Sequence, residues 1–135
     1  MKQVQVCIVG GGCVGLTLAL GLAKANISVA VLDAAPTQAS PSDDYGLRVS
    51  ALSIASQTLL KQLNVWPHII AERACAYTHM DVRDADSFGK ITFNNEQLEL
   101  EHLGHIVEND IIRFALIKEL EQQGNATVMF DTEYQ

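Results

Sequence analysis

The stretch from Val4 to Asp33 decides the fold, and it reads V-Q-V-C-I-V-G-G-G-C-V-G-L-T-L-A-L-G-L-A-K-A-N-I-S-V-A-V-L-D. The apolar run over 4–9 predicts a buried strand, and the stretch over 13–25 predicts a helix that leads into a second strand. Between strand and helix lies G-x-G-x-x-G, the fingerprint of a dinucleotide-binding turn. Its glycines are Gly10, Gly12 and Gly15. The unit predicts an α/β, Rossmann-like βαβ fold.

Each glycine of this turn has a separate physical role. Gly10 permits the tight turn, Gly12 lets a pyrophosphate approach the backbone, and Gly15 lets the helix pack closely on the strand. Asp33 ends the second strand and offers an acceptor to a ribose hydroxyl. The turn therefore predicts both a phosphate subsite and a ribose subsite.

The start of the predicted helix supplies the charge for the phosphate subsite. Cys13 and Val14 fill variable positions of the fingerprint, where backbone N–H groups and the helix dipole face the phosphates. The dipole could also lower the pKa of the Cys13 thiol. A structural role for Cys13 is nevertheless favoured, because the position is variable.

Composition excludes several classes of protein. The chain has 135 residues, 48% of them hydrophobic, and a net charge of −7, which argues against nucleic-acid binding. Its three cysteines and four histidines show neither a disulfide framework nor metal-ligand spacing, so no metal is expected. A reducing cytoplasm fits best. The glycine-interrupted N-terminus predicts neither a signal peptide nor a membrane span, which leaves only peripheral membrane contact.

The middle of the chain predicts a loop followed by helices. Proline, serine and acidic residues over 34–46 indicate the loop. Ser50 or Ser53 is expected to cap a helix, and Asn64 is expected to end it in the left-handed conformation. A shorter helix follows through about Arg73. The apolar stripe and core residues expected here are Leu52, Ala55, Leu59, Leu60, Leu63 and Trp66.

From residue 77 the sequence pattern changes from the period of a helix to that of a strand. Alternation over 77–84 and a short strand over 89–93 predict an antiparallel hairpin that turns at Asp86-Ser87. After the apolar stretch 103–107, Asn109 or Asp110 is expected to cap a helix that stops at Gly124. The segment 126–130 predicts a strand that returns to the sheet. The end at Gln135 suggests a cut, so we expect residues 1–135 to be the N-terminal portion of a larger domain.

Two later stretches are more specific than the glycine turn. They are R-V-S-A-L-S-I-A-S (48–56) with L-N-V-W (63–66), and L-G-H-I-V-E-N (103–109). With the opening unit, they resemble the N-terminal part of the FAD-dependent hydroxylases of ubiquinone biosynthesis, in the para-hydroxybenzoate hydroxylase superfamily. The D-x-D-S-F-G stretch over 84–89 most resembles the 2-polyprenylphenol hydroxylase branch. This family usually has Glu where this chain has Asp33, and the branch commonly has Trp at Arg83 and Gly at Asn64.

The resemblance implies that residues 1–135 are the N-terminal portion of an FAD-binding domain, and it also implies a fold and additional site residues. The fold is a parallel, doubly wound sheet flanked by helices, with a small antiparallel excursion. Arg48 would lie near the flavin or its phosphates, and the Glu108 side chain would contact the cofactor. Arg113 would face the same pocket. From the residues alone, Arg48 could equally be a surface arginine paired with Asp43 or Asp44, and Glu108 could simply face the helix macrodipole.

The resemblance also implies a reaction. FAD is reduced by NAD(P)H, O₂ adds to give a flavin C4a-hydroperoxide, and one oxygen atom passes to the ring of a polyprenylated phenol. No acid–base pair for this chemistry is visible, so no catalytic residue is assigned. The fragment itself is expected to be inactive and to hold FAD weakly. The full-length protein is expected in the cytoplasm, with peripheral association at the inner membrane or with a biosynthetic complex left open.

Two alternatives share the opening unit. An NAD-dependent dehydrogenase would use the same glycine turn, but it offers no account of residues 48–56. A non-catalytic dinucleotide-binding module would be complete at this length. Both are less favoured than the FAD-dependent monooxygenase.

Overall fold

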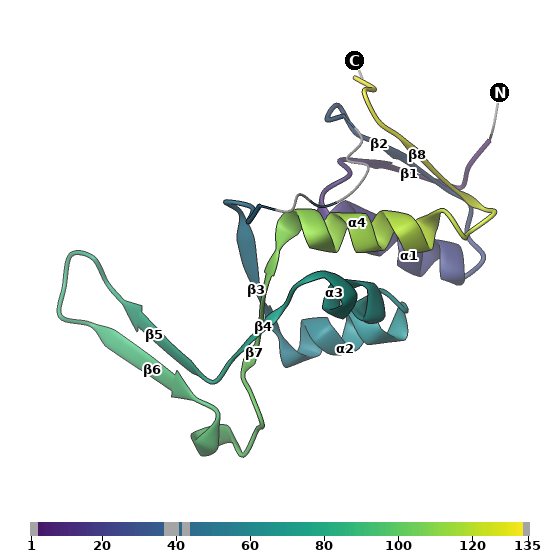
Figure 1. Cartoon of the computed structure of the whole chain (residues 1–135). Coiled ribbons are helices and arrows are strands. Elements are labelled where there is room, and N and C mark those ends of the chain that lie inside the picture. Colours follow the sequence, from purple (N-terminus) through teal and green to yellow (C-terminus); the bar gives the residue numbers. More distant parts are fainter. Residues whose placement is uncertain (1–2, 37–40, 42–43, 134–135) are drawn as a thin grey trace.

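The computed structural model describes residues 3–36, 41 and 44–133. A parallel sheet with two helices beneath it lies at one end, and a two-stranded hairpin projects from the other end (Figure 1). In chain order the elements are β1 (Val6–Val9), α1 (Cys13–Lys24), β2 (Val29–Leu32), β3 (Val49–Ser53), α2 (Ile54–Gln62), α3 (Trp66–Glu72), β4 (Cys75–Tyr77), β5 (His79–Arg83), β6 (Lys90–Asn94), the 3₁₀ helix η1 (Glu96–Leu98), β7 (Gly104–Glu108), α4 (Asn109–Leu120) and β8 (Ala126–Met129).

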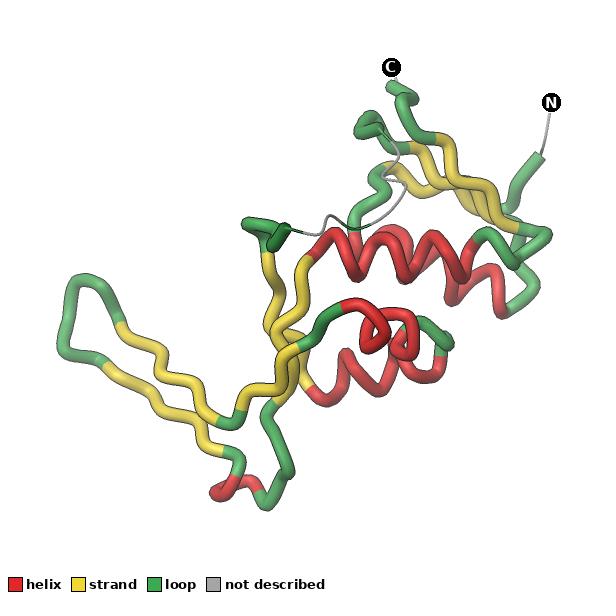
Figure 2. Tube along the Cα trace, viewed as in Figure 1, coloured by secondary structure: helices red, strands yellow, loops and turns green. Residues whose placement is uncertain are grey.

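The first sheet confirms the predicted Rossmann-like unit. Its strands are all parallel in the order β1-β2-β8, with Val29 of β2 opposite Val6 on one side and Ala126 on the other. The helices α1 and α4 lie along one face (Figures 1 and 2). On the opposite face, Cys7 and Val9 are exposed. Within the described residues, helices therefore cover one face of this sheet, whereas a doubly wound sheet has both faces covered.

The core lies between this sheet and the helices. Leu16 and Leu20 of α1, one turn apart, are fully buried, and Ile111 and Leu116 of α4 are fully buried too. Burying such a side chain contributes about 1.5–3 kcal/mol. Of the predicted core residues after β3, Leu60, Leu63 and Trp66 are buried, but Leu59 is 46% exposed. Packing of α1 against α4 places the two helix N-termini close together.

The segment before α2 corrects one prediction. Residues 49–53 form strand β3 instead of the start of a helix, so Leu52 pairs with His105 of β7. Ser53 is the N-cap of α2, and its Oγ accepts a hydrogen bond from Ser56 N at 3.3 Å. The alternative cap, Ser50, was wrong because antiparallel pairing with β7 outweighs the local helical pattern. Asn64 has a φ of 64°, which confirms the left-handed end.

The predicted strand over 77–84 is divided between two sheets. Tyr77 ends β4, which pairs with β7 in the sheet β3-β7-β4, and β5 begins at His79. The strands β5 and β6 form the expected hairpin, with Asp86-Ser87 in its turn. Asp84 N donates to Gly89 O at 3.0 Å and closes that turn. The antiparallel excursion is therefore confirmed, with an additional break at Thr78.

The start of α4 also differs from the prediction. The N-cap is Glu108, and neither Asn109 nor Asp110 caps the helix, because Asn109 already has helical backbone. The Asn109 side chain instead accepts a hydrogen bond from Ser50 Oγ at 2.6 Å. The helix ends at Leu120, before Gly124. The Asn109 side chain is therefore bonded to Ser50 of β3 and does not cap its own helix.

The predicted loop 34–46 shows neither helix nor strand at its described positions, and Ser40, Ser42 and Asp43 lie outside the described residues. In the part of the chain that the structure describes, no helix combines the length and the apolar character needed to cross a bilayer.

Candidate functional site

The glycine turn has the geometry that its sequence predicts. Gly10 has a φ of 106°, a conformation that side chains disfavour. A Cβ on Gly15 would lie far inside van der Waals contact with Gly10 O, so the helix could not approach the turn. A Cβ on Gly12 would meet no atom within 4 Å. The chain's own packing therefore requires Gly10 and Gly15, while Gly12 borders open space.

The N-terminus of α1 opens toward that space. Gly12 is the N-cap, no side chain caps the first turn, and the turn contains no acidic residue. The first intrahelical bond is from Leu16 N to Gly12 O at 3.0 Å. The N–H groups of Cys13 and Val14 precede that bond, where helical N–H groups lack intrahelical partners. This end of the helix suits an anion, because unpaired donors and the positive end of the dipole coincide.

Asp33 lies beside the turn and is held from two sides. Its Oδ1 accepts a hydrogen bond from Ala35 N at 3.1 Å, and its Oδ2 accepts one from Arg113 Nη2 at 3.3 Å. The same guanidinium donates from Nε to Gly11 O at 2.9 Å. Arg113 thus joins the acceptor of the predicted ribose subsite to the backbone of the predicted phosphate subsite. These contacts place the Arg113 guanidinium beside the glycine turn, and its approach to a cofactor stays a prediction.

Replacing Arg113 with Met is expected to weaken binding of the FAD that the family resemblance implies by about tenfold, equivalent to about 1.4 kcal/mol. The substitution leaves Asp33 without its ion pair while removing little side-chain volume. The affinity is measured by quenching of flavin fluorescence in the protein expressed from its complete reading frame. Lys118→Met, which removes a cation from the last turn of the same helix, is the matched control and should leave the affinity unchanged. Equal affinities for both variants would contradict the role of Arg113.

At Cys13 the structure argues against the less favoured alternative, a thiol pKa lowered by the helix dipole. Its thiol is partly buried, and burial raises the pKa despite the nearby Arg113 charge, which acts in the opposite direction. Its Sγ lies 3.6 Å from Asn109 O. The dipole therefore does not produce a low-pKa thiolate here. Cys13 instead contacts the start of α4.

Arg48 lies where three segments meet. Asn109 N donates to Arg48 O at 2.9 Å, so the backbone before β3 is bonded to the start of α4. Through Cys13, the same start of α4 touches the start of α1. The Arg48 side chain is exposed, and among the described residues it forms no ion pair with Asp44. Its other proposed partner, Asp43, lies outside the described residues.

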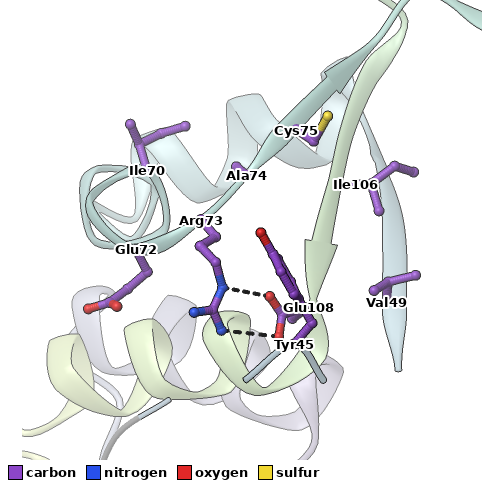
Figure 3. A pocket seen from close by; sticks show the side chains of 9 residues that line it. All are labelled: Tyr45, Val49, Ile70, Glu72, Arg73, Ala74, Cys75, Ile106 and Glu108. Atoms are coloured by element: carbon purple, nitrogen blue, oxygen red, sulfur yellow. Dashed lines mark hydrogen bonds and ion pairs between the residues drawn. The ribbon is translucent and has the colours of Figure 1, made fainter. Parts of the chain in front are cut away.

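The Glu108 carboxylate is hydrogen-bonded to other residues of the chain. Arg73 Nε donates to Glu108 Oε1 at 2.8 Å, and Arg73 Nη2 donates to Oε2 at 3.3 Å (Figure 3). Gly46 N donates to the same Oε2 at 2.5 Å. Arg73 and Glu108 line a pocket of about 420 Å³ together with Tyr45. Sequence reasoning missed Arg73, because an arginine at the end of a helix carries no signal of a partner 35 positions later.

This ion pair gives a pH prediction. The hydrogen bond from Arg73, followed by that from Gly46 N, lowers the pKa of Glu108. The folded-state pKa is therefore below the unfolded value of about 4.3, so the stabilisation is fully present above about pH 4.3 and is lost as pH falls through the folded value. Carboxyl NMR should show Glu108 titrating at lower pH than in Arg73→Met. An unchanged midpoint in that variant would contradict the assigned cause.

Together these groups fit a dinucleotide. The open side of Gly12 and the uncapped start of α1 suit a pyrophosphate, and Asp33 suits a ribose hydroxyl. Within the described residues, no set of three or more His, Cys, Asp or Glu side chains is arranged to hold a metal ion. The start of α1 offers backbone donors to such a ligand, and Asp33 offers a carboxylate acceptor.

Comparison with known proteins supports this interpretation. A family model described as "FAD binding domain" matches residues 3–135. The chain is 36% identical over 128 residues to the 3-demethoxyubiquinol 3-hydroxylase of Escherichia coli K12, covering 94% of this chain and 32% of that protein. It is 38% identical over 123 residues to the mouse (Mus musculus) mitochondrial ubiquinone biosynthesis monooxygenase COQ6, covering 87% and 25%. The chain thus spans about a third or less of these relatives.

Among solved structures, p-nitrophenol 4-monooxygenase PnpA from Pseudomonas putida DLL-E4 superimposes with a TM-score of 0.69 at 21% identity. The match covers 97% of this chain and 33% of that one. Because the identity is low, this likeness concerns the fold alone.

Proposed function

This chain belongs to the FAD binding domain family, and from that premise we propose that the full-length protein is an FAD-dependent aromatic-ring monooxygenase of ubiquinone biosynthesis. The family match confirms FAD as the cofactor, and the relatives confirm the resemblance to ubiquinone-biosynthesis hydroxylases. The NAD-dependent dehydrogenase is correspondingly disfavoured. The proposed substrates are a polyprenylated phenol, O₂ and NAD(P)H.

One observation carries the proposal for the site. Gly10 and Gly15 are required by the packing of the chain, whereas Gly12 is not, since a Cβ there would meet nothing. A glycine that the protein's own packing does not need, placed at an uncapped helix N-terminus, is accounted for by a ligand that approaches the backbone. We propose that this ligand is the FAD pyrophosphate.

The remaining contacts follow from this placement. The N–H groups of Cys13 and Val14 would bind phosphate oxygens, and Asp33 would accept a hydrogen bond from the adenosine ribose. Arg48, permanently charged and exposed at the α4 junction, would approach the phosphates or the flavin. When bound and reduced, FAD supplies the activation of O₂ for ring hydroxylation. The part of the protein described here holds and orients the cofactor.

The activity is tested on the protein expressed from its complete reading frame. NAD(P)H oxidation in the presence of a polyprenylated phenol should consume O₂ and yield a product that carries one oxygen atom from isotopically labelled O₂. Absence of the label from the product would contradict the proposal. Because the chain covers about a third of its relatives or less, residues 1–135 alone are expected to bind FAD weakly and not to hydroxylate.

Membrane and partner associations stay predictions. Peripheral association with the inner membrane or with a biosynthetic complex would bring the enzyme to a lipid-soluble substrate. Co-sedimentation of the purified protein with vesicles checks the first of these.

A further inference from the structure

The junction between β7 and α4 holds the segment that carries Arg48. Glu108 accepts a hydrogen bond from Gly46 N, two residues before Arg48. Asn109 N bonds to the Arg48 carbonyl at 2.9 Å, and Asn109 Oδ1 accepts from Ser50 Oγ at 2.6 Å. Consecutive residues of one junction therefore fix the backbone on both sides of Arg48.

Arg73 extends this junction to the end of α3. Its guanidinium binds both oxygens of Glu108, whose side chain is only 9% exposed, and lies 5.2 Å from the centroid of the Tyr45 ring (Figure 3). Its Nη2 also lies 3.5 Å from Asp44 O. Arg73 thus contacts the same 44–46 segment directly and through Glu108. The ion pair connects three parts of the sequence that are far apart.

We propose that Arg73 and Glu108 are positioning residues that act on the cofactor through Arg48. This inference rests on the proposed FAD site. Both carboxylate oxygens of Glu108 are bonded to Arg73, and one of them also to Gly46 N, so its role is to hold the 44–48 segment in place. That role replaces the direct contact with the cofactor that the family resemblance implies. Arg73, which no sequence pattern indicated, becomes part of the site.

The physical reason lies in the exposure of Arg48. Its side chain is exposed, and no hydrogen bond of that side chain to a described residue is present. A long side chain of this kind has many rotamers, so its direction depends on how firmly its backbone is fixed. Breaking the ion pair would release one side of that backbone. The bonds from Asn109 and Ser50 would still hold the other side, so the sheet should persist.

A double-mutant cycle on the FAD-binding, full-length protein tests this inference. Arg73→Met and Arg48→Met are each expected to weaken FAD binding by about tenfold, and the double variant should bind FAD no more weakly than Arg48→Met alone. Arg83→Met, which removes an exposed arginine from the hairpin, is the matched control and should change nothing. The melting temperature of each apoprotein reports on folding separately.

Every outcome decides the question. Additive losses in the double variant would show that Arg73 acts independently of Arg48, and unchanged affinity in Arg73→Met would show that it does not act at all; either would overturn the inference. If Arg73→Met does not fold, Glu108→Gln, which retains the shape of the side chain, takes its place in the same cycle. A wild-type protein that binds no FAD would overturn the proposed function first and this inference with it.

Discussion

Replacing Gly12 with Asp is expected to reduce FAD affinity by at least about 100-fold, equivalent to about 2.7 kcal/mol, while the apoprotein stays folded. The added Cβ meets no atom within 4 Å, and Asp is among the preferred N-cap residues, so α1 should be as stable as before or more so. The new carboxylate would occupy the donors at the start of α1 and repel the pyrophosphate. Flavin fluorescence and the apoprotein melting temperature measure the two effects.

Gly124→Asp is the matched control for this variant. Gly124 also borders open space, and it lies after α4, so the substitution adds the same charge without a steric clash. It should leave FAD affinity and stability unchanged. If Gly12→Asp bound FAD as tightly as this control does, the pyrophosphate could not lie at the start of α1.

Replacing Gly15 with Ala is expected to lower the free energy of unfolding, because its main effect is on folding and not on FAD binding. The new Cβ would overlap Gly10 O, which is backbone and cannot turn aside as a flexible side chain can. Forcing extra atoms into a packed site typically costs about 1–3 kcal/mol, and here the turn itself must shift. Chemical denaturation measures the loss against Gly12→Ala, where the same methyl group meets open space. Equal free energies of unfolding for the two variants would contradict the packing at this turn.

The first βαβ unit could be predicted from sequence because its determinants are local. Strand, turn and helix from Val6 to Lys24 each follow from hydrophobic period and glycine spacing, and the structure confirms them. The boundaries that failed depend on distant segments. Leu52 appeared helical because its spacing fits a helix, but pairing with β7, some 50 positions later, makes it part of a strand.

The candidate site divides in the same way. The glycines and Asp33 are adjacent in sequence to the elements that place them, so their positions could be predicted. The Arg113–Asp33 and Arg73–Glu108 pairs join residues 80 and 35 positions apart, and a spacing rule does not reach such distances. For Cys13, sequence indicated the helix dipole, but the degree of burial that raises its pKa depends on α4. Tertiary contacts therefore decide which charged groups pair.

The central claim is that the turn from Gly10 to Gly15 holds the pyrophosphate of FAD. Isothermal titration calorimetry on the deflavinated full-length protein tests it most directly. FAD is titrated in one experiment and NADH in a parallel one. The prediction is one FAD bound per chain that NADH does not displace, and loss of the FAD signal in Gly12→Asp but not in Gly124→Asp. Binding of NADH without FAD, or FAD binding that is indifferent to Gly12→Asp, would contradict the claim.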